Sequence, residues 1–219
     1  MPLYTAEALI LRTYKLGEAD RIVVFLTRDR GKKRGVAKGA RRPRSAFTGA
    51  LEPMTEVRVA YFEKERRELV GLNYAETHRS PLMLGSPDAL GYVSYFAELL
   101  DEWAQEADAD DRLYRLGASM LDALSIGVPV EPLARYFEYW LLRLQGVYPE
   151  SNAGLSEAAV AFLVGSRTLP PQQVGSMAVG PRALIELENV HRSLITMHLE
   201  KTLKSDRVLR DLRRHACTD

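Results

Sequence analysis

The first third of the chain alternates hydrophobic and polar residues in short runs typical of β-strands. Val57, Val59 and Tyr61 share one face of such a run, and Glu56 and Arg58 share the other. A period of two is expected of a half-buried strand. Turn residues separate five runs of this kind, which predict strands at residues 7–12, 22–27, 33–38, 54–62 and 69–77. Five short strands in such a segment fit a Greek-key barrel of the OB type, a fold that often binds oligonucleotides.

The hydrophobic period changes after residue 80. Residues 81–87 contain two prolines and a glycine, which interrupt regular structure, and hydrophobic residues then recur at helical spacing. Three apolar stripes follow: Leu90, Val93, Phe96, Leu100 and Trp103; Leu113, Leu116, Met120 and Leu124; Leu133, Phe137, Trp140, Leu141 and Leu144. We therefore predict an α+β protein with an OB-fold nucleic-acid-binding domain at 1–80. A helical bundle is predicted at 81–219.

Several residues predict where the later helices begin and end. Gly146 is placed to end the third helix, and Ser156 to cap the N-terminus of a short fourth one. Pro181 suits the first position of a long C-terminal segment that runs towards Arg214.

Charge is distributed unevenly along the chain. The formal net charge is only +1, yet residues 1–80 hold 17 basic and 10 acidic side chains, while residues 81–219 hold 13 and 19. The first part is therefore +7 and the second −6, which suggests two functional halves.

The positive charge is concentrated between residues 28 and 44. This segment holds nine cations and a single acidic residue, Asp29, a charge of +8 in 17 residues. Solvated surfaces usually interleave both signs, because uncompensated like charges repel. We therefore favour contact with a polyanion over an ordinary exposed surface. The predicted DNA-binding residues are Arg28, Arg30, Lys32, Lys33, Arg34, Lys38, Arg41, Arg42 and Arg44.

Turn residues run through the second part of this segment. Gly39, Pro43 and Gly49 place its cations on a loop that can follow a phosphate backbone, and not on a helix suited to a duplex groove. Phe47 is the only aromatic residue nearby, whereas tight binders of single strands stack bases on several aromatic rings. The pattern predicts electrostatic, sequence-independent binding that leaves base edges free to pair.

Residues 31–45 read Gly-Lys-Lys-Arg-Gly-Val-Ala-Lys-Gly-Ala-Arg-Arg-Pro-Arg-Ser, and this string resembles the β-hairpin and basic loop of the RecO family. The neighbouring strings Gly-Glu-Ala-Asp at 17–20 and Gly-Ala-Leu-Glu-Pro at 49–53 agree, as does His-Leu-Glu-Lys-Thr-Leu-Lys-Ser at 198–205. The resemblance implies an OB domain followed by a helical domain, binding of single- and double-stranded DNA, and annealing of complementary strands.

The resemblance also implies partners in recombination and repair of DNA damage. Family members act with RecR to load RecA onto DNA coated by single-strand-binding protein, whose acidic C-terminal tail docks on the helical domain. Some members carry a four-cysteine zinc module after the third helix. Here residues 146–165 contain no cysteine or histidine, so we predict no metal and no cofactor.

Two further groups of cations are open to more than one interpretation. Lys201, Lys204, Arg207 and Arg210 are candidates for an auxiliary DNA contact, although cations near a helix C-terminus are favoured by its dipole in any case. The second group could clamp the carboxylates of an acidic peptide or pair with carboxylates of the chain itself. It consists of Arg112, Arg115, Arg135 and Arg143.

No pattern typical of an enzyme occurs. The chain lacks a phosphate-binding Gly-x-x-x-x-Gly-Lys-Ser/Thr loop, a Gly-x-Ser-x-Gly elbow and a His-Glu-x-x-His pair, and its four histidines lack metal-ligand spacing. A nuclease that uses Glu18 and Asp20 is a distant alternative. An RNA- or ribosome-associated OB protein and a scaffold for an acidic protein remain the main rivals. One cysteine and no long apolar run predict a cytoplasmic protein, and the resemblance implies association with the nucleoid.

Overall fold

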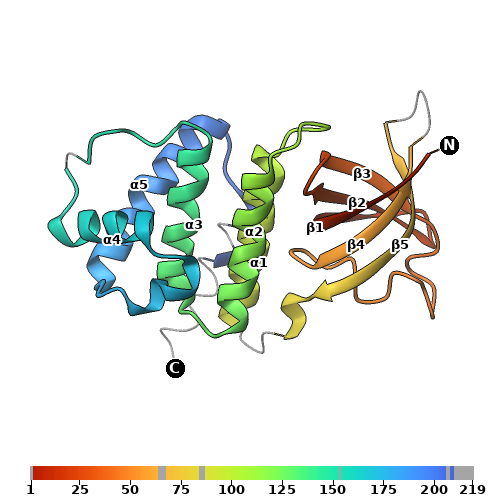
Figure 1. The fold of residues 1–219 in the computed structure, drawn as a ribbon, viewed down its shortest axis with the longest axis horizontal. Coiled ribbons are helices and arrows are strands. Elements are labelled where there is room, and N and C mark those ends of the chain that lie inside the picture. The colour runs from red at the N-terminus through yellow and green to blue at the C-terminus, as the bar shows by residue number, and fades with distance from the viewer. Residues whose placement is uncertain (1, 64–67, 84–86, 153, 206–207, 210–219) are drawn as a thin grey trace. The chain divides into compact units, whose positions relative to one another are not determined.

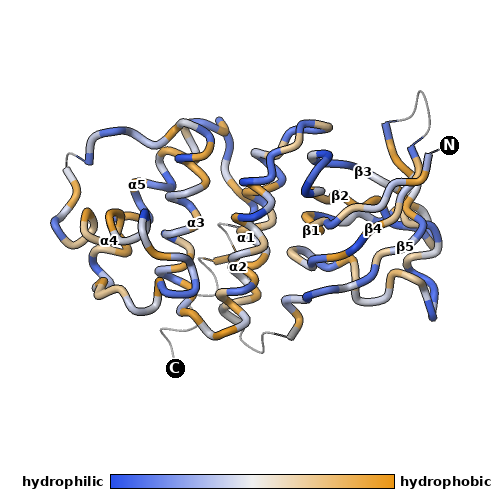
Figure 2. The backbone as a smooth tube through the Cα atoms, in the orientation of Figure 1, coloured by the Kyte–Doolittle hydropathy of each residue, from blue (hydrophilic) through white to orange (hydrophobic). Residues whose placement is uncertain are grey.

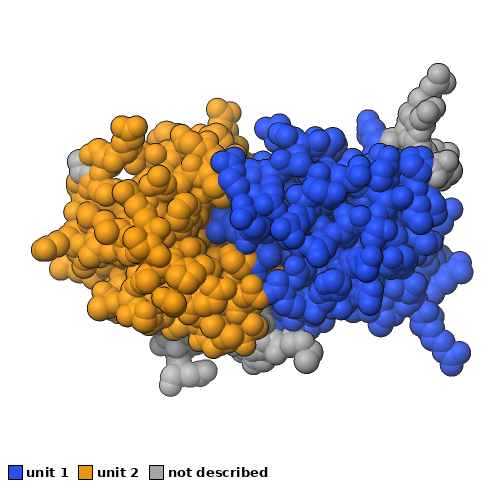
Figure 3. Space-filling model, in the orientation of Figure 1, with its two compact units in different colours: residues 1–85, 93–118 blue, residues 86–92, 119–219 orange. Residues whose placement is uncertain are grey.

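The computed structural model describes residues 2–63, 68–83, 87–152, 154–205 and 208–209. Two compact units share the chain (Figure 3). Unit 1 comprises residues 1–85 and 93–118, and unit 2 comprises residues 86–92 and 119–219. Among the described residues, no helix is long and apolar enough to cross a membrane.

Five strands close into a barrel in unit 1 (Figure 1). Their order around the barrel is β1-β2-β3-β5-β4, and only the contact between β3 and β5 is parallel. This topology confirms the predicted five-stranded barrel of the OB type. The strands are β1 (Leu3–Leu16), β2 (Asp20–Thr27), β3 (Gly31–Ala37), β4 (Glu56–Phe62) and β5 (Val70–Arg79).

Strand β1 is much longer than the predicted run at residues 7–12. Its first part, from Leu3 to Leu9, pairs with β4, and its second part, from Ala8 to Leu16, pairs with β2. A register shift between Ile10 and Arg12 bends the strand between its two partners. The ends of β1 are held by backbone pairing and are mostly exposed, which is why hydrophobic alternation marked only the middle.

The barrel interior is filled by alternate residues of the strands and by the connection from β3 to β4. Ile10, Phe25, Val59 and Tyr61 are fully buried there. The connection adds three further buried side chains, Phe47, Ala50 and Leu51. Burial of these groups holds the connecting loop against the barrel by the hydrophobic effect.

The outer face of β1 is also apolar, and helical segments of unit 1 cover it. Helices α1 (Pro87–Trp103) and α2 (Asp111–Ser125) each contribute part of their length to this unit. A Cβ atom at Gly117 of α2 would lie 2.7 Å from Leu9 Cδ1 and 2.8 Å from Leu100 Cδ1, so the glycine permits close approach. Residues 93–118 therefore belong to the same compact unit as the barrel. The predicted division lies after residue 80, where strands give way to helices, and so assigns these residues to the helical part. The division into functional domains at 1–80 and 81–219 stays a prediction.

The connection between α1 and α2 covers an edge of β3. Strand β3 pairs with β5 only from Gly35 onwards. Nearer its start, the Lys32 N–H donates to the Gln105 carbonyl and the Ala107 N–H donates to the Lys32 carbonyl, at 3.1 and 3.2 Å. These bonds satisfy backbone groups that an uncovered strand edge would expose.

Unit 2 contains the remaining helices, along which hydrophobic positions recur (Figure 2). The predicted helix ends are confirmed: Gly146 has a φ of +68° directly after the cap of α3, and the Ser156 hydroxyl accepts from the Ala159 N–H. Pro181 begins α5, which ends at Leu199, so the predicted continuation towards Arg214 is interrupted at Glu200, where φ is +53°. Helical backbone resumes at Lys204, and residues 206, 207 and 210–214 lie outside the described residues. The helices are α3 (Val130–Leu144), α4 (Glu157–Thr168) and α5 (Pro181–Leu199), with 3-10 turns η1 (Pro81–Met83, in unit 1) and η2 (Pro171–Ser176).

We predict that Gly31→Ala destabilises the protein by more than twice as much as Gly49→Ala. Both glycines have positive φ, +67° and +73°, where a Cβ costs about 1–2 kcal/mol. At Gly31 the added Cβ would also lie 2.3 Å from the Asp108 carbonyl oxygen, whereas at Gly49 it meets no atom within 4 Å. Denaturant unfolding gives the two free energies; equal losses would show that the 104–110 connection does not approach β3 this closely.

Candidate nucleic-acid interface

The loop that follows β3 presents four exposed cations within seven residues. It runs from residue 38 to residue 55 through consecutive turns, with Gly39, Arg44 and Gly49 at positive φ. Phe47 is 5% exposed and fixes the middle of the loop to the barrel interior. The backbone is therefore held, while Arg41, Arg42 and Arg44 are exposed.

An open cleft of about 510 Å³ is lined by residues of this loop and by Arg21 of β2. Arg41, Arg42 and Arg44 line it together with Thr48 and the single acidic residue Glu52. Backbone N–H groups, hydroxyls and guanidinium groups are the usual partners of phosphate oxygens. The cleft thus combines positive charge with a concave surface.

Arg21 was missed by the sequence analysis because it lies outside the basic run. Strand pairing places it opposite Ala37, at the end of β3 where the loop begins. Its guanidinium donates to the Thr13 hydroxyl at 3.2 Å. The charge alone could not identify Arg21, since its position depends on the register of β2 against β3.

Four of the nine predicted cations are exposed and make neither an ion pair nor a side-chain hydrogen bond in the part of the chain that the structure describes. They are Arg34, Lys38, Arg42 and Arg44. Their charges are not neutralised within the described residues and face solvent, as binding of an anionic chain requires.

Lys32 and Lys33 differ from these four, because the structure directs both into ion pairs of the protein itself. The Lys32 ammonium is 3.3 Å from an Asp101 carboxylate oxygen and donates to the Asp101 carbonyl at 2.5 Å. The Lys33 ammonium is 2.8 Å from the Glu63 carboxylate. The lysine side chains are only 16% and 18% exposed, so neither is presented to solvent as the predicted principal phosphate contacts would be.

The other predicted cations have partners but remain exposed. Arg28 pairs with Glu7 and Asp111, at 3.2 and 3.0 Å, and these bonds raise its pKa, the hydrogen bond to Asp111 contributing most. The Arg30 guanidinium lies 4.3 Å from the centre of the Tyr4 ring, a cation–π contact. Both lie away from the group of arginines that lines the cleft.

The four arginines considered for an acidic peptide belong to two units and differ in burial. Arg112 and Arg115 belong to unit 1, are 63% exposed and pair with Asp110 and Asp111. Arg143 belongs to unit 2, where it donates to the Tyr139 hydroxyl and lies near the Trp140 ring. Arg135 is only 4% exposed, which leaves it almost no surface to offer a peptide. Arg135 is therefore closed to a peptide, and the use of the three exposed arginines by an acidic peptide stays a prediction.

Arg135 instead belongs to a buried charged network between α3 and α5. Its guanidinium lies 2.8 Å from Glu138 and 3.0 Å from Glu188. The second Glu138 oxygen is 3.0 Å from His191 Nδ1, and His191 is fully buried. Pairing on both sides compensates part of the cost of removing these charges from water.

Two of the four residues predicted to form an auxiliary DNA contact lie among the described residues. Lys201 and Lys204 are exposed beyond the end of α5. Arg207 and Arg210 lie outside the described residues.

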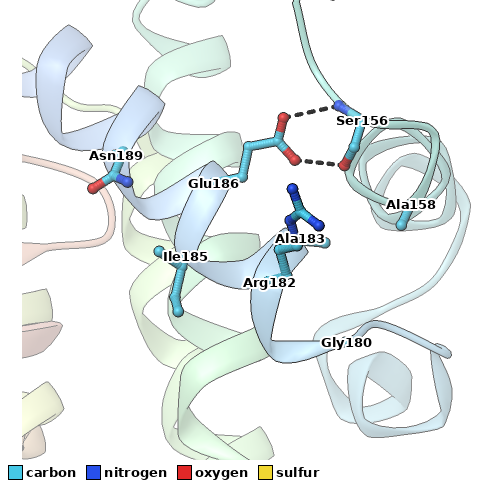
Figure 4. A pocket seen from close by; sticks show the side chains of 8 residues that line it. All are labelled: Ser156, Ala158, Gly180, Arg182, Ala183, Ile185, Glu186 and Asn189. Carbon is cyan, nitrogen blue, oxygen red and sulfur yellow. Dashed lines mark hydrogen bonds between the residues drawn. The ribbon is translucent and has the colours of Figure 1, made fainter.

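A second pocket, of about 610 Å³, lies at the N-terminal ends of α4 and α5 (Figure 4). Its Glu186 carboxylate accepts from the Ser156 hydroxyl at 2.5 Å and from the Ser156 N–H at 2.8 Å. These two bonds lower the pKa of Glu186. Much of the remaining lining is apolar, from Ala158, Ala183 and Ile185. The carboxylate and the serine satisfy each other, and the described lining has a single cation, Arg182, whereas four arginines line the cleft. Across the described residues, no cluster of three or more His, Cys, Asp or Glu side chains is arranged to hold a metal ion.

Comparison with known proteins gives matches along most of the chain. Residues 1–81 match the family described as "Recombination protein O N terminal", and residues 84–157 match "Recombination protein O C terminal". A "DNA repair protein RecO" of Symbiobacterium thermophilum is 33% identical over 186 residues, which cover 83% of this chain and 68% of that protein. One of Pelotomaculum thermopropionicum is 28% identical over 94% of this chain and 93% of that protein.

Other similar proteins are matched over a smaller share of their length. A "DNA repair protein RecO" of Koribacter versatilis is 40% identical over 150 residues, 68% of this chain. The match covers 61% of that protein, and a match to an Anaeromyxobacter protein of the same description covers 58%. The chain therefore aligns with about six tenths of the length of these relatives.

We predict that Arg135→Met lowers the free energy of unfolding by about 3–5 kcal/mol, since it leaves Glu138 and Glu188 without their buried partner. Arg112→Met removes the same charge from an exposed ion pair and should cost no more than about 1 kcal/mol. Chemical unfolding of both variants measures the difference. A loss below about 1 kcal/mol for Arg135→Met would mean that α3 and α5 do not depend on this network.

Proposed function

The chain belongs to the RecO family, and from this premise we propose that it is a DNA-binding mediator of recombination and DNA repair. In this proposal the barrel and its basic loop hold the sugar–phosphate backbone of single strands, and also of duplex DNA, without catalysing a reaction. The observation that carries the proposal is the cleft lined by Arg21, Arg42 and Arg44, whose exposed cations make it a positive surface.

The open cations are the proposed phosphate contacts. Arg34, Lys38, Arg42 and Arg44 are exposed without ion pairs among the described residues, and Arg21 adds a fifth charge from the neighbouring strand. We assign smaller roles to Lys32 and Lys33, because transfer to a phosphate would require each to leave a carboxylate. Arg28 and Arg30 are exposed and remain candidates for peripheral contacts.

Annealing follows from how the strand would be held. The loop contains one aromatic residue, Phe47, which is buried in the barrel and cannot stack on a base. Contacts to phosphates alone neutralise the repulsion between two strands but leave base edges unoccupied. A strand held in this way can pair with its complement.

The partners are proposed from family membership. RecR would bind together with this protein, and the acidic C-terminal tail of single-strand-binding protein would dock on the helical part, so that RecA is loaded on the exposed strand. Arg112 and Arg115 are exposed arginines that such a tail can reach, but each already has a carboxylate partner. The main rival, binding of RNA, is supported by the same cations, which do not distinguish the two sugars.

We predict that Arg42→Gln weakens single-strand binding and reduces its salt dependence, whereas Lys33→Gln does neither. Both substitutions remove one positive charge from the same segment, but only Arg42 is open. The log–log slope of affinity against salt should fall by about 0.7 for Arg42→Gln, since one phosphate contact is lost. Fluorescence anisotropy at several salt concentrations, with matched DNA and RNA oligomers, measures both quantities.

Equal changes for the two variants would show that total charge, and not the open surface, determines binding. A wild-type slope near zero would remove the electrostatic basis of the proposal, and preference for RNA would favour the rival.

We further predict that the combined change of Arg42 and Arg44 to Gln slows annealing of complementary strands coated with single-strand-binding protein. The loss of two open cations reduces the hold on each strand, and the effect should exceed the loss of single-strand affinity because both strands must be held. Fluorescence quenching between labelled strands reports the rate. Annealing at the wild-type rate would separate this activity from the cleft.

A further inference from the structure

The turn between β1 and β2 carries an acidic residue whose role is not explained by attraction for a polyanion. Asp20 begins β2 and is half-buried beside the basic loop. Its carboxylate oxygen Oδ1 accepts the Gly39 N–H at 2.7 Å. Gly39 lies directly after Lys38, at the point where β3 ends and the loop turns away with a φ of +67°.

A second set of bonds ties the same turn to the loop through Arg41. The Arg41 N–H donates to the Ala19 carbonyl at 2.9 Å. Its guanidinium nitrogen Nη1 donates to the carbonyls of Gly17 and Glu18, at 3.1 and 2.8 Å. Four hydrogen bonds therefore join residues 17–20 to residues 39–41, and three of them are accepted by backbone carbonyls.

These bonds act on the part of the loop that lines the cleft. Arg42 follows Arg41 directly, and the Arg42 N–H donates to the Gly39 carbonyl at 3.0 Å. The bond from Gly39 to Asp20 therefore fixes the first turn of the loop, from which Arg42 and Arg44 project. Phe47 fixes the loop further along, so the turn at 17–20 is the anchor nearest the open cations.

We infer that Asp20 is a positioning residue for nucleic-acid binding: with Arg41, it holds the first turn of the basic loop so that Arg42 and Arg44 face the cleft. This inference rests on the proposed function and adds a requirement for a hydrogen-bond acceptor at residue 20, beside a site that binds an anion. The negative charge of Asp20 by itself opposes phosphate binding. Two alternatives, a role through charge alone and a role in positioning the loop, therefore predict opposite changes in affinity when Asp20 is removed. If Asp20 only contributes charge, its loss tightens binding, and if it positions the loop, its loss weakens binding.

Glu18 supplies a matched control from the same turn. It carries the same charge, is exposed, and contacts the loop through its backbone carbonyl. Glu18→Ala therefore removes an equal negative charge and leaves the bonds to Gly39 and Arg41 in place. Asp20→Asn supplies a second control, because the amide oxygen can still accept the Gly39 N–H while the charge is lost.

The experiment measures binding of a fluorescent single-stranded DNA by the full chain and its three variants at low salt. We expect Asp20→Ala to weaken binding by about tenfold, the effect of losing one charge-assisted hydrogen bond. Asp20→Asn and Glu18→Ala should bind as tightly as the wild type or slightly more tightly. Amide hydrogen exchange of the free proteins should be faster at residues 39–42 in Asp20→Ala alone, with the thermal unfolding midpoint showing that the barrel remains folded.

Tighter or unchanged binding by Asp20→Ala overturns the inference, as does weaker binding with unchanged exchange at 39–42. Equal weakening by Asp20→Asn also overturns it, since the acceptor is then not what matters. If Asp20→Ala fails to fold, Asp20→Val takes its place, since valine suits a strand and also lacks the acceptor; the same results are expected, and unchanged or tighter binding overturns the inference. Failure of the wild type to bind DNA counts against the proposed function, whereas wild-type binding that Asp20→Ala retains counts against this inference only.

Discussion

The structure depends on holding like charges close together on one loop while leaving them unpaired. Such charges repel one another and lose their attraction for a phosphate chain if carboxylates neutralise them. The barrel fixes the loop through contacts in which no carboxylate of the described residues pairs with Arg42 or Arg44, so these cations keep their charge for a ligand. Phe47, Ala50 and Leu51 are buried in the barrel interior, and carbonyls of the 17–20 turn accept from Arg41. The loop is therefore fixed by apolar burial and hydrogen bonds, and Arg42 and Arg44 remain open.

The same segment of sequence also supplies cations with a structural role. Lys32 lies on β3 where residues 105–107 cover its edge, and its ammonium pairs with Asp101. Arg12 of β1 reaches the same Asp101 carboxylate at 3.2 Å. These pairs help to hold the 93–118 segment, which covers the apolar outer face of β1. The acidic residue Asp101 of this segment thus helps to complete the barrel unit.

Charge has a different role in unit 2. Arg135, Glu138 and His191 are almost entirely buried between α3 and α5, where their geometry is fixed by mutual pairing. Buried charges that satisfy each other contribute little net energy but become costly when one partner is removed. Among the described residues, chemically identical arginines therefore occur in three environments: exposed without an ion pair, as Arg42; paired within the barrel unit, as Arg12; and buried in a charged network, as Arg135.

Local sequence patterns were enough to predict most elements of the fold and the segment in which positive charge is concentrated. Five strands, the end of α3 at Gly146, the cap at Ser156 and the start of α5 at Pro181 were predictable, because strand alternation and helix capping depend on residues close together in the chain. The length of β1 was not, because its ends are held by pairing with two other strands. Tertiary structure also decided which cations are open: Lys32 and Lys33 meet Asp101 and Glu63, and Arg21 joins the cleft, only through strand register and packing. Ion pairs and clefts form between residues that are distant in sequence. Which of these residues lie close together in space depends on the fold, so the local pattern of charges cannot predict them.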